Sequence, residues 1–431
     1  MREMVKTDIP WMPEISSDFS VGYVKQYFFV SKDLSNDGEP ERVLKLARAG
    51  IVEKDVTTNE GQMAASYAGY NKVCVGDLLL NPMDLYSGAN CNVSELNGVI
   101  SPAYSNLRAK KTGTVVPKYY DYYFKSQYWL MAMFAHGKGV SFDNRWTLNN
   151  DALRSYEIPV APYAMQQKIV DAIQDGEKKV DSLIANVQAQ IEKLKAYKQS
   201  LITEVVTKGL DPNAPMKDSG VEWLGAVADT RRIFRLKYLL NFPMQYGANE
   251  SGDKYTDGSV RYIRITDITA DGKLKDDENN QYISDTIASE YTLKDGDVLF
   301  ARSGGTVGKS FLFRKEYGQC AFAGYLIKAE CNQKVLLPEY LIYYTQSSLY
   351  NLWKNMIFIQ ATIQNIGANK YSNMEIPIPT IAEQESIVEH LKTKCSQIDQ
   401  LISLKESKIE KLQQYKRSLI YEYVTGKKEV V

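Results

Sequence analysis

The stretch ARSGGTVGKSF, residues 301–311, combines glycines, a lysine and an arginine in the way that phosphate-binding loops do. A nucleotide-binding loop requires G-x-x-x-x-G-K-[ST], because a fixed number of backbone N–H groups must surround the phosphates before the lysine reaches them. The spacing fails here, since Ser303 occupies the position of the first glycine and Gly304 leaves the loop one residue short. The flanking segments predict strand, tight turn and strand, where an NTPase needs a loop that opens a helix. The remaining interpretations are a plain hairpin turn or a site for another anion.

Residues for other catalytic chemistry are scarce. The two histidines, His136 and His390, lie near no recognisable nucleophile motif, so the sequence does not favour a catalytic triad or the metal site of a hydrolase. The segment NPMD at Asn81 can be compared with the N-P-P-aromatic loop of adenine methyltransferases, but Met83 and Asp84 break that pattern. The five cysteines show no C-x-x-C spacing, which predicts unpaired thiols in a reducing compartment and no zinc site.

Composition bounds the class of protein. With 431 residues the chain is long enough for two or more cores, and its 44% hydrophobic content is typical of a soluble globular protein. No segment at the N-terminus resembles a signal peptide, and no apolar run is long enough for a membrane span, so we expect a cytoplasmic protein without membrane contact. The 52 basic and 52 acidic residues cancel, so any nucleic-acid binding must come from local patches.

The chain is an internal duplication. The segment from Glu157, EIPVAPYAMQQKIVDAIQDGEKKVDSLIANVQAQIEKLKAYKQSLITEVVT, aligns without a gap to the segment from Glu375, EIPIPTIAEQESIVEHLKTKCSQIDQLISLKESKIEKLQQYKRSLIYEYVT. Weaker pairs extend the repeat: RVLKL with RYIRI, VGDLLL with DGDVLF, and VPKYYDYYFKS with LPEYLIYYTQS. The sequence therefore predicts two copies of one plan, a strand-rich mixed domain followed by a helical segment.

Each helical segment carries an apolar stripe at heptad spacing, which predicts a long helix with one seam. Lys198 interrupts the first stripe, and Lys405 and Lys416 interrupt the second. A shorter helix is expected to precede each long one, beginning at Ala164 or Ala382 after an extended, proline-containing segment. A single seam needs a partner, and we expect the two long helices to pack against each other, antiparallel, within the chain. The alternative is a coiled coil between chains.

The expected length of the helical segment is close to one turn of B-DNA. Residues 179–206, at about 1.5 Å per residue, would form a rod of roughly 40 Å. One turn of B-DNA is close to that, about 34–36 Å, which is the separation of paired half-sites on one face. Because the two globular domains differ while the helices agree, they would read different halves of an asymmetric site.

Together, the duplication, the EIP-x-P-x-x-x-[EQ]Q segment, the IEKL…YK-SLI…VT helix, the DSGVEWLG linker and the Gly-Gly-Thr-x-Gly-Lys turn resemble the specificity subunit of type I restriction-modification enzymes. The resemblance covers essentially the whole chain. It implies a non-catalytic subunit that binds double-stranded DNA and no cofactor itself. It would recruit two modification subunits, which use S-adenosylmethionine, and through them restriction subunits, which use ATP and magnesium.

The fold class expected from this plan is α+β, with two pseudo-repeated mixed α/β target-recognition domains separated by two long helices packed as an antiparallel coiled coil. We expect the first target-recognition domain at 1–156 and the first helical spacer at 157–210. The second domain follows at 211–374, with a linker at 211–225, and the second spacer at 375–431. The first domain departs from the family pattern, because NPMDLYSGAN replaces the Gly-Thr-x-Gly-Lys turn.

The second domain supplies most of the residues that we expect to contact DNA. Arginine suits guanine or phosphate, amide side chains suit adenine, and a Gly turn offers backbone N–H groups. The candidates are Arg302, Ser303, Thr306 and Lys309 in the Gly turn, Tyr246 and Gly247, Arg264, and Gln360, Thr362, Gln364 and Asn365 in IQATIQN.

The first domain has weaker signals. RAKK is its densest basic run, although a charge run is often only solvated. The candidates for DNA contact are Asn81, Tyr86, Arg108, Lys110, Lys111 and Arg145. A cluster of tyrosines, matched in the second domain, is expected to be helix core and not a platform for stacked bases; it comprises Tyr119, Tyr120, Tyr122, Tyr123, Tyr340, Tyr343 and Tyr344.

The helices also carry identities that an apolar seam does not require. These residues are candidates for contact with modification subunits: Glu192, Lys193 and Tyr197 in the first helix, and Glu410, Lys411 and Tyr415 in the second. One alternative function remains at this stage, a coiled-coil scaffold that joins a complex without reading DNA.

Overall fold

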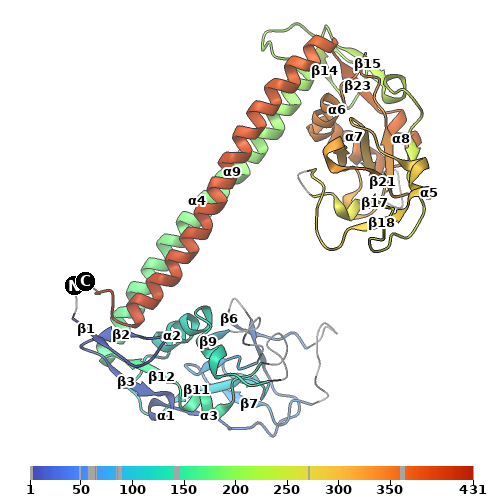
Figure 1. Cartoon of the computed structure of the whole chain (residues 1–431). Helices are drawn as coiled ribbons and strands as arrows, with labels where there is room; N and C mark the ends of the chain where they lie inside the picture. Colours follow the sequence, from blue (N-terminus) through green and yellow to red (C-terminus); the bar gives the residue numbers. More distant parts are fainter. Residues whose placement is uncertain are drawn as a thin grey trace. The chain divides into compact units, whose positions relative to one another are not determined.

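The computed structural model describes residues 3–47, 50–56, 64, 66–83, 85, 90–139, 146–269, 272–359 and 365–430, except for the side chains of Thr306 and Ile359. The chain divides into two compact units (Figure 1). Unit 1 comprises Met1–Gln188 and Ser407–Val431, and unit 2 comprises Ala189–Glu406. The long helices contribute to both units, so the limits expected for separate recognition and spacer domains stay a prediction.

Unit 1 contains two four-stranded sheets and two strand pairs. The first sheet has the order β6 (Gly50–Glu53), β5 (Val43–Ala47), β10 (Gly98–Ile100), β7 (Asn71–Val73). The second has the order β4 (Phe28–Val30), β11 (Ser105–Ala109), β8 (Leu78–Leu80), β9 (Cys91–Val93). The pairs are β1 (Met4–Lys6) with β2 (Glu14–Ser16), and β3 (Ser20–Tyr23) with β12 (Glu157–Val160).

Unit 2 repeats this plan. Its sheets have the orders β18 (Gln281–Ser284), β17 (Ser259–Ile263), β21 (Cys320–Phe322) and β16 (Gln245–Tyr246), β22 (Leu326–Ala329), β19 (Val298–Ala301), β20 (Ser310–Leu312). Its pairs are β13 (Met216–Asp218) with β14 (Ala226–Ala228), and β15 (Arg232–Arg235) with β23 (Glu375–Ile378). In both units one parallel pair lies among antiparallel ones: β10 with β5, and β21 with β17. The strand orders of the two units match except that β7 has no counterpart among the described strands of unit 2, so the predicted duplication is confirmed.

The repeated Gly-Asp dipeptide has a structural role. Asp77 and Asp297 are both buried and stand just before the equivalent strands β8 and β19. The Asp77 carboxylate accepts a hydrogen bond from the Cys74 N–H at 2.9 Å, and that of Asp297 accepts one from the Lys294 N–H at 2.8 Å. Each aspartate thus closes the turn that begins a central strand.

Short helices cover the sheets. They are α1 (Val24–Tyr27), α2 (Pro117–Trp129) and α3 (Asn150–Arg154) in unit 1, and α5 (Asp285–Ala288), α6 (Pro338–Gln346), α7 (Ser348–Ile359) and α8 (Ala368–Ser372) in unit 2. Single 3-10 turns are η1 (Met133–His136), η2 (Leu236–Leu239), η3 (Ile265–Asp267), η4 (Ser289–Tyr291), η5 (Gly304–Thr306) and η6 (Lys315–Tyr317). Both α2 and α6 begin with proline, which suits the first helical position.

The tyrosine cluster lies in the core, as expected. Tyr119, Tyr120 and Tyr123 of α2, and Tyr340 and Tyr344 of α6, are fully buried. The Tyr119 hydroxyl donates to the Val424 carbonyl at 2.6 Å, and that of Tyr340 to the Val206 carbonyl at 3.2 Å. Each unit thereby fastens the last turn of a long helix into its core.

The two long helices are α4 (Tyr163–Lys208) and α9 (Ile381–Val424). The shorter helices expected from Ala164 and Ala382 are not separate, and that prediction is wrong. No proline interrupts either segment, so each short helix continues into the long one. Gly176 has a low helix propensity, but it lies inside α4. A Cβ placed there would lie 2.7 Å from the Leu419 side chain, so the glycine permits close packing of α4 against α9.

The helices α4 and α9 lie side by side and run in opposite directions (Figure 1). In unit 1 the Lys416 ammonium lies 2.8 Å from the Asp181 carboxylate, and in unit 2 that of Lys198 lies 2.7 Å from Asp399. The Lys405 ammonium donates to the Gln190 side chain at 2.6 Å. The lysines that interrupt the predicted seam therefore pair across it, and the expected antiparallel packing within one chain is confirmed.

Each core contains the end of a long helix. In unit 1 Ile420 and Val424 join the apolar residues of α2 and β8, and in unit 2 Val205 and Val206 join those of α6 and β19. No helix among the described residues is both long and apolar enough to cross a membrane. All five cysteines carry unpaired thiols, as expected.

Candidate nucleic-acid interface

The Gly turn joins β19 and β20 as a hairpin, so the predicted strand, turn and strand are confirmed. The Ala301 N–H donates to the Lys309 carbonyl at 2.8 Å, and the Gly308 N–H donates to the Ala301 carbonyl at 3.0 Å. Gly304 and Gly308 have φ values of 73° and 82°, which are left-handed conformations that favour glycine. A strand follows the turn, where a nucleotide-binding loop requires a helix.

The structure brings together candidates from three separate segments. The Arg302 guanidinium lies 4.9 Å from the centre of the Tyr246 ring, which is a cation–π contact. Ser303 forms an isolated antiparallel bridge with Asn365. The Tyr246 hydroxyl accepts a hydrogen bond from the Ala368 N–H at 2.9 Å. We call Tyr246, Arg302, Ser303 and Asn365 the reading cluster.

Gly247 acts through its backbone. A Cβ at this position would lie 2.2 Å from the Phe322 carbonyl oxygen and 2.4 Å from that of Ala323, so no larger residue fits. The glycine therefore lets β16 approach β21 closely, and it sets the position of Tyr246 next to it. Its role in DNA binding stays a prediction.

Arg302 has no carboxylate partner among the described residues. Its closest polar contact there is from Nη1 to the Gly324 carbonyl, at 3.5 Å, and its buried Nε has no hydrogen-bond partner. The buried Oδ1 of Asn365 also has no hydrogen-bond partner in the described part of the chain. Unpaired buried polar atoms cost stability, so their occurrence on adjoining segments is typical of a site that a ligand completes.

Two other arginine candidates are already engaged inside the protein. Arg264 places Nη2 2.8 Å from Asp267 Oδ1, and it also donates to the Asn279 carbonyl at 3.1 Å. Arg108 binds both oxygens of the buried Asp77 at 2.7 Å, and this hydrogen bonding raises the pKa of the guanidinium. Their roles in DNA binding stay predictions, but the structure gives each arginine a stabilising role.

The remaining candidates of unit 1 are dispersed. Lys110 donates to the Lys25 carbonyl at 2.5 Å, and Lys111 is exposed in the next turn. Asn81 caps the end of β8, where its Oδ1 accepts from the Met83 N–H at 3.0 Å. Several candidates lie outside the described residues, namely Tyr86, Arg145, Gln360, Thr362, Gln364 and the side chain of Thr306.

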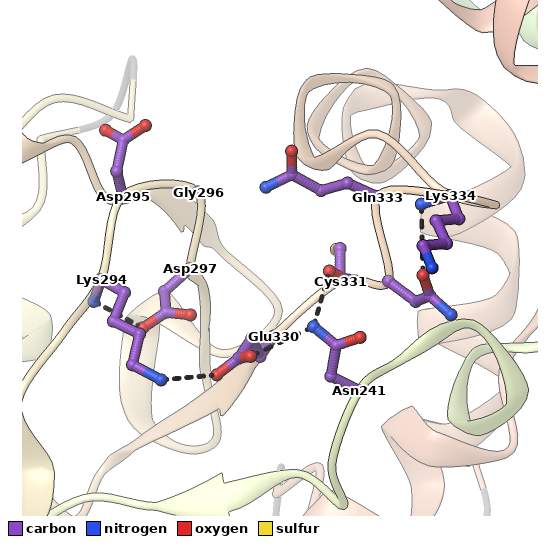
Figure 2. Close-up of a pocket in the computed structure, with 10 residues that line it drawn as sticks. Asn241, Lys294, Asp295, Gly296, Asp297, Glu330, Cys331, Gln333 and Lys334 are labelled. Atoms are coloured by element: carbon purple, nitrogen blue, oxygen red, sulfur yellow. Dashed lines mark hydrogen bonds and ion pairs between the residues drawn. The ribbon is translucent and has the colours of Figure 1, made fainter.

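The cavity drawn in Figure 2 is unsuited to a phosphate. Its volume is 440 Å³, and its lining includes Asp295, Asp297 and Glu330. The Lys294 ammonium lies 3.6 Å from Glu330 Oε2, and Asn241 donates to Oε1 of the same carboxylate at 3.1 Å. Burial raises the pKa of the Asp297 carboxyl. The acidic groups outnumber the two lysines of the lining and would repel a DNA strand, so this cavity is not a candidate for the interface.

The six candidates for partner contact on the long helices are all exposed. Tyr197 and Tyr415 occupy equivalent positions and are 57% and 51% exposed. The sequence interpretation missed a second equivalent pair, Leu183 and Leu401, which are 51% and 47% exposed. Identity between the two copies was the available signal for these leucines, because an exposed leucine adds nothing to the seam.

Comparison with known proteins agrees with this architecture. The family described as Type I restriction modification DNA specificity domain matches residues 232–414. The type I restriction enzyme MjaVIII specificity subunit of Methanocaldococcus jannaschii is 22% identical over 420 residues, 93% of this chain and 86% of that protein. The EcoBI specificity subunit of Escherichia coli is 23% identical over 401 residues, covering 89% of this chain and 78% of that protein. These matches agree with the resemblance seen in the sequence: residues 232–414 match the specificity-domain family, and both relatives are named type I specificity subunits.

Solved structures share the fold of this chain. A chain reported as "Structural basis underlying complex assembly and conformational transition of the type I R-M system" aligns with a TM-score of 0.70 and 15% identity, covering 95% of this chain and 98% of that one. The HsdS subunit from Thermoanaerobacter tengcongensis aligns with a TM-score of 0.52 and 13% identity, covering 96% and 98%. The predicted fold class is thereby confirmed.

Proposed function

We propose that this chain is the specificity subunit of a type I restriction-modification enzyme and reads an asymmetric, bipartite DNA site, with one half-site for each unit. The observation that carries this proposal is the pair of equivalent hairpins, β8–β9 and β19–β20. The strands match, but the connecting segments differ, since one is NPMDLYSGAN and the other is the Gly turn. A repeated scaffold with different loops suits recognition of two different base sequences.

The reading cluster is the part of unit 2 that would contact base edges. A guanidinium already stacked on Tyr246 loses little conformational freedom on binding, and arginine is the residue that most often reads guanine in the major groove. Asn365 supplies an amide, which suits adenine. Lys309, Arg264 and the basic residues of unit 1 would contribute phosphate contacts, which position the protein without selecting a sequence.

The chain itself has no catalytic role in this proposal. Two modification subunits would dock on α4 and α9 in equivalent ways, through Glu192, Lys193 and Tyr197 and their counterparts Glu410, Lys411 and Tyr415. Restriction subunits would join through the modification subunits. S-adenosylmethionine, ATP and magnesium would be bound by those partners, whose chemistry requires them.

The test is replacement of Arg302 in the complex with the modification subunits. Arg302→Ala should weaken binding to the preferred duplex by roughly 5- to 150-fold and relax selection within one half-site, because a good arginine–base contact is worth about 1–3 kcal/mol. The other half-site should be unchanged. Selection from random duplexes at low salt, followed by methylation mapping, measures both effects.

Matched variants make this test specific. Arg232→Ala removes another arginine of unit 2 that lies over an aromatic ring, 5.4 Å from the centre of Phe234, and it should leave selection unchanged. Arg302→Lys keeps the charge but loses the planar fork, so it should relax selection as the alanine does. A wild-type complex that selects no sequence at all would favour the scaffold function.

A further inference from the structure

A second cavity in unit 2 is lined in part by the Gly turn. Its volume is 600 Å³, and its lining comes from α4, the segment around Lys273, the Gly turn, α6, α7 and α9. Its described lining contains four lysines, namely Lys198, Lys273, Lys309 and Lys354, and one acidic residue, Asp399. We call this cavity the lysine basin. In contrast to the acidic cavity of Figure 2, its lining carries an excess of positive charge.

The carboxylate of Asp399 is already neutralised. Both of its oxygens accept hydrogen bonds from the Lys198 ammonium, at 2.7 Å. Among the described residues, Lys309 and Lys354 form no ion pair with an acidic group, so they add positive charge to the lining. Burial lowers the pKa of the Lys354 ammonium, and no acidic group offsets that effect. A partly desolvated cation of this kind is stabilised by an anion.

The Gly turn is shaped around Lys354. A Cβ on Gly308 would lie 2.4 Å from Cδ of Lys354, so the glycine makes room for the lysine stem. The Tyr350 hydroxyl donates to the Gly308 carbonyl at 2.7 Å, and the Lys354 ammonium lies 5.9 Å from the centre of the Tyr350 ring. The turn, Tyr350 and Lys354 thus hold one another in place.

Neutral polar groups complete the lining. The hydroxyls of Ser310 and Thr345 lie 2.6 Å apart, and the Thr345 hydroxyl donates to the Ile342 carbonyl at 2.7 Å. The side chains of Gln346 and Asn351 also line the basin. Ammonium and amide groups around a small open cavity match a phosphate, which accepts hydrogen bonds on several oxygens.

We infer that the lysine basin binds a phosphate group of the DNA backbone beside the half-site read by unit 2. This inference rests on the proposed function and adds an anchor that selects no base. The continuity of the Gly turn favours DNA as the source of the phosphate, because Arg302 at one end belongs to the reading cluster and Lys309 at the other end lines the basin. One strand could contact both ends of the turn.

The test uses Lys354→Met in the complex with modification subunits. The slope of log K against log salt concentration should fall by about 1, since one phosphate contact is lost. Affinity at low salt should fall equally for preferred and random duplexes, so the selected bases should not change. The control, Lys334→Met, removes an exposed lysine that lines the acidic cavity of the same unit and should leave the slope unaltered.

Other results would overturn the inference. An unchanged salt slope for Lys354→Met, and for the second variant Lys354→Gln if the first does not fold, would show that no backbone phosphate lies in the basin. If Lys354→Met reduces assembly of the complex, but the complexes that do form bind DNA with normal affinity, the basin would instead bind an acidic segment of a partner protein. Saturable binding of inorganic phosphate to the wild-type chain, with no change in the DNA slope, would assign it to a free anion.

Failure of the inference is distinguishable from failure of the proposed function. Sequence selection by the wild-type complex, with loss of selection in Arg302→Ala, tests the function whatever happens at the basin. A wild-type complex that selects its site while Lys354→Met keeps the full salt slope would reject the anchor alone.

Discussion

Gln166 and Gln384 show how one side chain can fix the junction between a domain and a long helix. Both are fully buried, and each lies in the first turn of its helix. The Gln384 Oε1 accepts from the Leu337 N–H at 2.8 Å, while its Nε2 donates to the carbonyls of Val335 at 2.9 Å and Pro379 at 3.1 Å. Gln166 binds its own backbone partners in the same way. The repeated glutamine of the sequence motif is therefore structural.

We predict that Gln384→Ala lowers the free energy of unfolding by roughly 2–3 kcal/mol, because it leaves buried backbone groups without partners. Urea titration followed by circular dichroism measures the change. Gln167→Ala is the matched control, since Gln167 is exposed and bonds only to Asp171 on its own helix, and it should shift stability by less than about 0.5 kcal/mol. Equal effects of the two substitutions would contradict this role for Gln384.

At the scale of elements, α4 and α9 were predictable in type, seam and orientation because heptad spacing and duplication are local features of sequence. The sequence did not explain the lysines in the seam, because the partner of Lys198 is Asp399, on the other helix. The partners of the arginine candidates were also not visible in the local sequence. Arg108 was singled out for its basic neighbours, but strand pairing brings Asp77 to it from a distant segment.

The reading cluster was predictable only as separate residues. Tyr246, Arg302 and Asn365 were chosen from loops, and their contact depends on the pairing of β16 with β22 and of β22 with β19. The lysine basin gave no signal in the sequence. Lys354 lies on α7 among apolar residues, and only the fold places it against Gly308. Long-range pairing is what local patterns cannot supply.

We predict that the exposed faces of the long helices bind the modification subunits. Lys193→Glu combined with Lys411→Glu should prevent formation of a complex of one specificity subunit with two modification subunits, because the same charge is reversed at both equivalent surfaces. Native mass measurement of the co-expressed proteins gives the stoichiometry. An intact one-to-two complex would show that these faces are not the docking surfaces.

The control for this experiment reverses two exposed lysines of the same helices that are not matched between copies. Lys179→Glu combined with Lys394→Glu makes an equal change in net charge, but the equivalent positions hold Gln397 and Gly176. Assembly should survive this pair. The comparison separates docking at matched positions from a general effect of charge.

At the scale of the whole molecule, α4 and α9 are the elements that both units share. Under the proposed function, two half-sites would need a spacer between their readers, and the pair of packed helices is the candidate for it. The last turns of α4 and α9 are each fastened into a unit through the Val206 and Val424 carbonyls, so we expect a change in helix length to affect the spacing of the half-sites.

We predict that lengthening both helices moves the half-sites apart. The Lys405 side chain donates to Gln190, so four residues inserted after Ala189 and four inserted after Lys405 keep the seam matched. Four residues are close to one turn and add about 6 Å, which approaches two base-pair steps of about 3.4 Å. The methylated site should therefore keep its bases and gain one to two base pairs in the gap. An insertion in α4 alone is the control, since it shifts the seam out of register and should reduce stability. An unchanged gap in the double insertion would mean that the helices do not set the spacing, and altered bases would mean that reading depends on more than each unit's own loops.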